Sequence, residues 1–351
     1  MGHGPVTARG PWPLDGWESD DTREVDVAIK DQLEKLDRAQ QEHRKLGIAA
    51  ATFKKFSEDG STNLASMIAF WAFFSIFPLF LALVTILGYV LPAGTRVNVL
   101  KHVASFFPLL DPSTLHSLTG SWWPLLVGVV SALWSGLAVV KTTQTAFNSV
   151  WEIPKKDRPG FVEKLERSLL ALGTIGVGLV VATIISGFVT GQSVGVNLGW
   201  YGRLAGYVIA ILLDVGLFVA AFRMLTDREI SVRDVLPGAL LAGIAFWILQ
   251  QISSFIISRH LSSAQNTYGN FATVITMLWW FYLQAQITLL GAQLNVVLKE
   301  KLHPRSLFGG PETEADARAL EAYAQEETYH ERQEVESRVD TQPRDREHAR
   351  S

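Results

Sequence analysis

Long runs without a charged residue most constrain what this chain can fold into. Lysine, arginine, aspartate and glutamate are absent from residues 60–95, 117–140, 168–202, 235–258 and 261–298. A sixth stretch, 204–222, is interrupted only by Asp214. An α-helix needs roughly 20 apolar residues to cross about 30 Å of hydrocarbon. The sequence therefore predicts an all-α, polytopic membrane helix bundle whose six transmembrane helices lie near residues 64–91, 121–140, 168–190, 204–224, 236–258 and 271–298.

Composition supports this class of protein. Charged residues make up 19% of the chain, below the roughly one quarter that is usual in soluble domains. Cysteine is absent, which excludes disulfides, thiolate metal sites and cysteine nucleophiles. The net charge of −3 gives no reason to expect a nucleic-acid partner. Residues 1–45 are polar and hold no short apolar core, so we predict no cleaved signal peptide and expect the first span to act as the membrane signal.

The positions of lysine and arginine predict the orientation of the spans. Four of these cations lie near the span ends on one side, namely Arg96, Lys101, Arg203 and Arg259. Sixteen lie on the other side: Arg44, Lys45, Lys54, Lys55, Lys141, Lys155, Lys156, Arg158, Lys164, Arg167, Arg223, Arg228, Arg233, Lys299, Lys301 and Arg305. Short cytoplasmic loops carry the excess of positive charge. The bias places both termini in the cytoplasm, and an even number of spans agrees with this.

Three regions follow from these patterns: a polar, partly disordered N-terminal region (1–50), the membrane domain (51–302) and a charged tail (303–351) expected to be disordered or weakly helical. Apolar residues within 24–46 recur at helical spacing. That helix is either a solvated surface helix or one that docks a partner or the membrane surface. Residues 96–107 form a second amphipathic segment, which lies in the outer interface or packs on the rim of the bundle.

Polar side chains inside the spans are the candidate functional residues, because each is costly in hydrocarbon and must face protein or water. They form a candidate intramembrane polar path of Asp214, Gln250, Gln286, Gln293 and Asn295. Two interpretations stay open: hydrogen bonds that join the helices, or a hydrated cavity along which a polar lipid headgroup moves. Recurring small residues permit a homo-oligomer without requiring one.

The sequence offers no pattern typical of catalysis. Its eight histidines are not spaced to bind a metal from one helix or loop, and it holds no glycine-rich phosphate loop, GxSxG or HExxH motif. We therefore predict no enzymatic activity, no metal and no cofactor.

Three blocks of sequence carry a family resemblance. The first runs from the aromatic pair Phe70-Trp71 to Ser75 and Pro78, where Pro78 is expected to kink the first span and Ser75 to satisfy freed carbonyls. The second joins Trp134, Asn148 and Trp151. The third contains Pro237, Gly238, Tyr268, Gly269, Tyr282, Gly291, Gln293 and Asn295. Together, over roughly residues 50–300, they resemble the YihY/virulence factor BrkB family, once labelled ribonuclease BN.

The resemblance implies a six-span bacterial inner-membrane protein with cytoplasmic termini, and it implies no established reaction. The chain departs from the family pattern at Gln293, where an acid is common, and at Phe70-Trp71, which replace a pair of tyrosines. Our leading hypothesis is a bundle that moves or accommodates an amphipathic solute, in the first place a membrane lipid. The alternative is a scaffold that docks envelope or cytoplasmic proteins through helix 24–46 and the charged tail.

Overall fold

The computed structural model describes residues 35, 37, 40–90, 122–189, 199–307, 313–330, 332, 333 and 335. Within these residues all regular structure is helical and no strand is present. The helices are α2 (Arg44–Glu58), α3 (Ser61–Val90), α6 (Trp122–Val150), α7 (Phe161–Val189), α8 (Gly199–Met224), α9 (Val232–Tyr268), α10 (Ala272–Lys299) and α11 (Glu314–Glu326). Two short 3-10 helices, η1 (Lys155–Asp157) and η2 (Gly269–Phe271), lie in connections.

Six of these helices, α3 and α6 to α10, are long and apolar enough to cross a membrane. This confirms the predicted all-α, six-span fold. Three helices extend well beyond the predicted bounds, because charged residues do not by themselves stop a helix. Helix α7 begins at Phe161 instead of residue 168. Helix α6 continues past Lys141 to Val150, and α9 continues past Arg259 to Tyr268. Gly269, with φ +55°, then begins the turn into α10.

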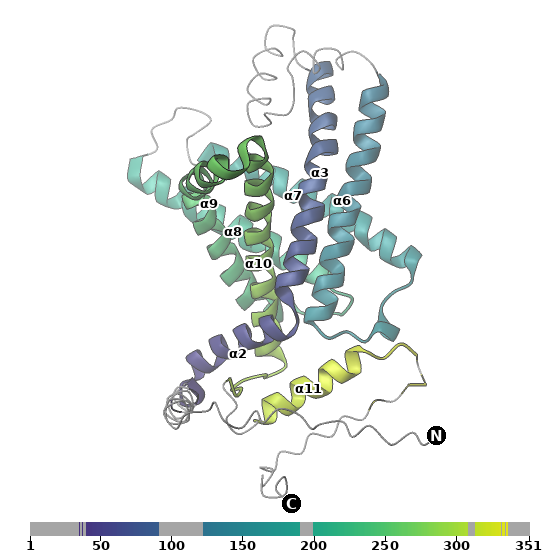
Figure 1. Ribbon diagram of the computed structural model, residues 1–351, viewed down its shortest axis with the longest axis vertical. Coiled ribbons are helices and arrows are strands. Elements are labelled where there is room, and N and C mark those ends of the chain that lie inside the picture. Colours follow the sequence, from purple (N-terminus) through teal and green to yellow (C-terminus); the bar gives the residue numbers. More distant parts are fainter. Residues whose placement is uncertain are drawn as a thin grey trace, which may run out of the picture.

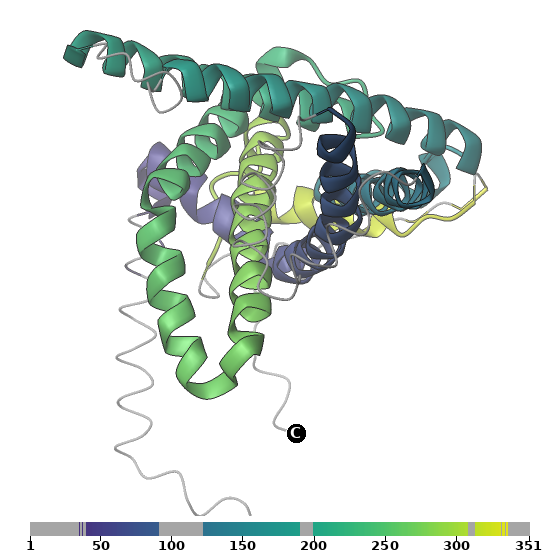
Figure 2. The same ribbon diagram turned by 90° about the horizontal axis from the view of Figure 1, so that it is seen from above.

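The spanning helices pack in the order in which they follow one another, and α10 closes the set by packing on α3 (Figures 1 and 2). Helix α10 lies between α9 and α3 and also contacts α2. It exposes no large apolar side chain, whereas α3 and α6 to α9 all do, so α10 is the inner helix. Helix α7 runs obliquely across the bundle (Figure 2) and packs closely on α8 but sparsely on α6.

Helices α2 and α11 lie across one end of the bundle, which we call the basal end (Figure 1). The chain turns sharply from α2 into α3 at Gly60, whose φ of +59° is a conformation that glycine adopts without strain. The predicted helix 24–46 lies mostly outside the described residues, and the amphipathic segment 96–107 lies wholly outside them. The described helix α2 begins only at Arg44.

The charged tail, expected to be disordered or weakly helical, contains one helix, α11, within the described residues 313–328. A capping box between Thr313 and Asp316 begins α11. Ala315 and Ala319 lie on the buried face of this helix. The fully buried Arg305 then ties the segment to α2, because its guanidinium pairs with Asp316 at 2.9 Å and with Glu58 at 2.7 Å. The charge of Arg305 is thus neutralised by carboxylates that the fold brings close to it. Composition alone would have placed this charge in solvent.

Candidate functional site

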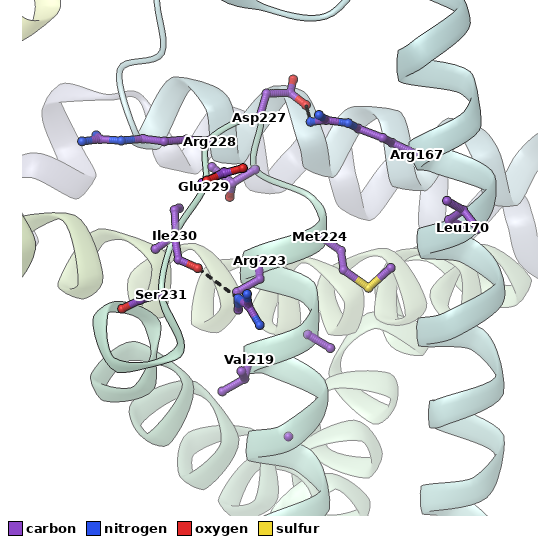
Figure 3. Close-up of a pocket in the computed structure, with 13 residues that line it drawn as sticks. Arg167, Leu170, Val219, Arg223, Met224, Asp227, Arg228, Glu229, Ile230 and Ser231 are labelled. Carbon is purple, nitrogen blue, oxygen red and sulfur yellow. Dashed lines mark hydrogen bonds and ion pairs between the residues drawn. The ribbon is translucent and has the colours of Figure 1, made fainter.

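A pocket of about 1100 Å³ opens at the basal end between α7, α8 and the loop that joins α8 to α9 (Figure 3). Its inner wall is apolar and comes from Leu170 of α7 and from Gly216, Val219, Ala220 and Met224 of α8. Its mouth is polar and is lined by Arg167, Arg223, Thr226, Asp227, Arg228, Glu229 and Ser231. One cavity therefore joins an apolar surface to a group of three guanidinium groups.

The loop that closes the pocket is fixed by Asn148 at the end of α6. Asn148 donates from Nδ2 to Asp227 Oδ2 at 2.5 Å, and its Oδ1 accepts from the Asp227 backbone N–H at 2.9 Å. Arg167 of α7 approaches the other oxygen of Asp227 at 3.3 Å (Figure 3). Asn148, singled out by the resemblance, thus holds the α8–α9 loop against α6 while Asp227 connects that loop to α7.

Arg223 and Arg228 differ in the partners of their guanidinium groups. The Nε of Arg223 donates to the Ile230 carbonyl at 3.0 Å (Figure 3). Among the described residues, no carboxylate lies within ion-pair distance of Arg223. Arg228 instead pairs with Glu300 at 3.0 Å, and its guanidinium lies 5.8 Å from the Trp151 ring. Arg223 is therefore the pocket cation whose charge is least neutralised.

Residues of the third resemblance block meet where α9 crosses α10. Gly238 and Gly291 face each other so closely that a Cβ on Gly291 would lie 2.7 Å from the Gly238 carbonyl oxygen. The buried Asn295 accepts from the Gly238 backbone N–H at 2.6 Å. Pro237 precedes this contact inside α9. Small residues let the two backbones approach, so the block encodes a helix crossing.

A buried polar cluster joins the basal helices to the bundle. Lys55 is fully buried and pairs with Asp59 at 3.0 Å and with Glu152. Gln293 of α10 donates to Asp59 at 2.7 Å and to Ser61 Oγ at 2.9 Å. The Tyr323 ring of α11 lies 5.0 Å from the Lys55 ammonium. Two carboxylates therefore share one buried cation.

The five residues of the predicted polar path do not form one hydrogen-bonded chain in the part of the protein that the structure describes. Gln293 belongs to the basal cluster, and Asn295 belongs to the α9–α10 crossing. Asp214 of α8 and Gln286 of α10 are half-buried, and Gln250 of α9 is exposed. A path along Asp214, Gln250 and Gln286 stays a prediction.

The other described residues of the resemblance make contacts within or between helices. Ser75 donates to Ala72 O at 2.7 Å, one turn before Pro78, and so does not reach the Phe74 carbonyl that the proline leaves free, in contrast to the prediction. The exposed Trp134 ring packs edge-on against Trp71 with centroids 6.0 Å apart. Tyr282 is half-buried and packs against the core. The side chain of Tyr268 lies outside the described residues.

The sequence did not single out the charged residues that shape these sites. Arg167, Arg223 and Lys55 entered only as members of the charge bias, and Glu152 entered not at all. Glu152 follows α6 with a left-handed backbone (φ 51°), a conformation that is visible only in the structure. Of these residues Lys55 and Glu152 are buried, whereas Arg167 and Arg223 are exposed. The burial of Lys55 and Glu152 depends on their pairing across 97 residues of sequence.

The basal cluster predicts a pH dependence of stability. Burial raises the pKa of the Glu152 carboxyl from 4.5 to about 7, with Asp59 and Glu326 adding to the rise and Lys55 opposing it. Because the pKa is higher in the folded state, this stabilisation is complete below pH 4.5 and is lost as the pH rises to about 7. The free energy of unfolding in detergent should fall by about 3 kcal/mol across this window. Glu152→Gln should remove that part of the slope, and equal slopes in both proteins would contradict the assignment.

Comparisons with known proteins agree with this architecture. The family model described as Virulence factor BrkB matches residues 52–315. The ribonuclease-like protein YfkH of Bacillus subtilis is 24% identical over 265 residues, which are 71% of this chain and 94% of YfkH. No solved structure matches the chain.

Two further relatives are named UPF0761 membrane proteins. The one from Acinetobacter baylyi is 24% identical over 257 residues, covering 70% of this chain and 60% of its own length. The one from Alcanivorax borkumensis is 27% identical over 254 residues, which are 69% of this chain and 58% of the relative. The chain thus spans about three fifths of these two relatives. With six helices able to cross a membrane and a family match over most of its length, the chain is a multi-pass membrane protein and belongs to the Virulence factor BrkB family.

Proposed function

We propose that this protein binds membrane lipid and moves it between the leaflets of the bacterial inner membrane. The observation that carries the proposal is the pocket between α7 and α8, in which an apolar wall meets an arginine-lined mouth. A lipid has the same two parts in the same order, acyl chains and a polar headgroup. Sites for such ligands are concave and largely apolar, with a few polar groups that fix orientation.

The position of the pocket supports lateral entry from the bilayer. Leu170 and Val219 lie within spanning segments of α7 and α8, whereas the mouth lies at the end of α8. Leu170 of the apolar wall is exposed on the surface of α7, so this wall is accessible from the side of the bundle. We propose that a lipid exchanges with the bilayer on this side of the bundle.

We further propose that the basal end faces the cytoplasm. The excess of lysine and arginine in the connections at this end supports this orientation, because such residues are retained on the cytoplasmic side. A fluorescent protein fused to the C-terminus should then fluoresce in intact cells as a cytoplasmic fusion does. A fusion that reports a periplasmic C-terminus would reverse the orientation.

We propose no covalent step for this protein. Its residues supply no nucleotide-binding motif, and among the described residues no three histidine, aspartate or glutamate side chains gather as a metal site. Movement of lipid would then run down a concentration gradient or be driven by a partner protein. The ribonuclease-like name of YfkH belongs to that relative, and RNA cleavage by the purified chain with added Mg²⁺ or Mn²⁺ would contradict our proposal.

Reconstitution into liposomes tests lipid movement. Vesicles that carry the full chain and a fluorescent lipid should expose inner-leaflet probe to an external quencher faster than protein-free vesicles. Gly216→Phe should slow this by about tenfold, which corresponds to about 1.4 kcal/mol of barrier, because Gly216 lines the pocket and has open space around it.

The matched control is Gly173→Phe. Gly173 lies in α7, also has open space around it and does not line the pocket. This variant should move lipid as the unchanged protein does. Equal movement in protein-containing and protein-free vesicles would refute the proposed function, and equal slowing by both variants would move the path away from this pocket.

A further inference from the structure

We infer that the pocket between α7 and α8 selects lipids with an anionic, phosphate-bearing headgroup, and that Arg223 is the residue that contacts this phosphate. The inference rests on the proposed lipid-binding function and adds the class of lipid to it. It follows from the charges at the mouth, the geometry of the Arg223 guanidinium and the depth of this residue in the bundle.

The charges at the mouth leave one cation available. Arg167 pairs with Glu163 at 3.0 Å and with Asp227 at 3.3 Å. Arg228 pairs with Glu300. Arg223 has no carboxylate within ion-pair distance among the described residues, so its positive charge faces the pocket without a fixed counter-ion.

The two acids in the lining do not cancel this charge. Asp227 is held by both hydrogen bonds of Asn148 and by Arg167. Glu229 and Arg223 are both exposed, so water and salt weaken their mutual attraction, and the two do not form an ion pair among the described residues. An anion that enters the mouth therefore finds in Arg223 a positive charge that no fixed carboxylate neutralises.

The guanidinium of Arg223 is oriented to bind two oxygens at once. Its Nε already donates to the Ile230 carbonyl at 3.0 Å (Figure 3). This bond fixes the plane of the group and leaves the two terminal nitrogens as donors. Arginine binds phosphate through such paired donors, whereas a lysine acts as a point charge.

The depth of Arg223 matches that of a lipid headgroup. It occupies the last turn of α8, where the spanning segment ends at Met224. Gly216, Val219 and Ala220 lie on the same face of α8, and Gly216 lies about 10 Å deeper at 1.5 Å per residue. A phosphate at Arg223 would thus place the acyl chains along the apolar wall, the arrangement by which basic pockets between spans bind anionic lipids.

Lipid-binding measurements on the purified full chain test the inference. Native mass spectrometry would compare phosphatidylglycerol with phosphatidylcholine of identical acyl chains. We expect about tenfold tighter binding of phosphatidylglycerol. Arg223→Gln should abolish this preference. It should weaken the binding of phosphatidylglycerol more than that of phosphatidylcholine, whose phosphate is offset by the choline cation. Arg223→Lys should retain part of the preference.

The matched control is Arg233→Gln, which removes the same charge from an exposed position near the start of α9 that does not line the pocket. This variant should keep the full preference. Equal binding of both lipids by the unchanged protein would overturn the inference and leave the proposed function standing, whereas binding of neither lipid would overturn both. Loss of preference in both arginine variants would overturn the role of Arg223. Displacement of phosphatidylglycerol by an equal concentration of inorganic phosphate would identify a free-anion site instead.

Discussion

Replacing Lys55 by methionine is expected to destabilise the folded protein by about 3–5 kcal/mol, because removing one partner of a buried ion pair leaves an uncompensated charge. Here two carboxylates, Asp59 and Glu152, would lose the same cation. The fully buried position of Lys55 denies both carboxylates hydration as a substitute. Thermal unfolding in detergent at pH 8, where Glu152 is largely ionised, would show the loss most clearly.

The matched control is Lys155→Met. Lys155 pairs with Glu327 at 2.6 Å, but the Glu327 side chain is 63% exposed, so the loss of this surface ion pair should leave the stability nearly unchanged. The double variant Lys55→Met with Glu152→Gln should recover part of the stability, because a single carboxyl then has to be neutralised. A Lys55→Met protein as stable as the unchanged chain would show that this cluster does not hold α2 against the bundle.

Replacing Gly238 by alanine is expected to destabilise the protein by about 3 kcal/mol. The added Cβ would collide with the Gly291 carbonyl oxygen and with the Asn295 side chain, which accepts the Gly238 N–H. Backbone atoms cannot rotate away as a flexible side chain can, so α9 and α10 must separate. Overpacking of this kind typically costs 1–3 kcal/mol, and the unfolding transition in detergent would measure it.

Gly173→Ala serves as its control, because a Cβ at Gly173 in α7 meets no atom within 4 Å. Alanine favours a helix over glycine by about 1 kcal/mol, so this variant should be as stable as the unchanged protein or slightly more stable. If both alanine variants behave alike, the close approach of α9 and α10 is not a determinant of stability.

The charged tail was expected to be disordered or weakly helical, and the sequence did not show how a helix there would pack. Residues 311–351 are rich in acids and bases of both signs, a composition typical of disorder. Yet the described residues 313–328 contain α11, which is fixed at its start by the Asp316 capping box and held through Arg305. The composition of the tail cannot show that Arg305 pairs with Glu58, because Glu58 lies 247 residues away from Arg305 in sequence.

The candidate site was predicted in part. Asn148, Gly238, Gly291, Gln293 and Asn295 were singled out and do make defined contacts. Of these, Gln293 and Asn295 were also placed in the candidate polar path, but in the structure they join helices near the basal end. Arg223, which now defines the proposed headgroup site, was counted only toward the orientation of the spans.

The sequence by itself determined the six spanning helices, because a bilayer leaves long apolar segments no way to satisfy their backbone except as helices. The tertiary structure alone decided which polar side chains are buried and what they contact. Lys55 meets Glu152 across 97 residues, and Gln293 meets Asp59 across 234. Such pairs form only when separate helices pack, since apolar periodicity specifies that a face is buried but not which partner covers it.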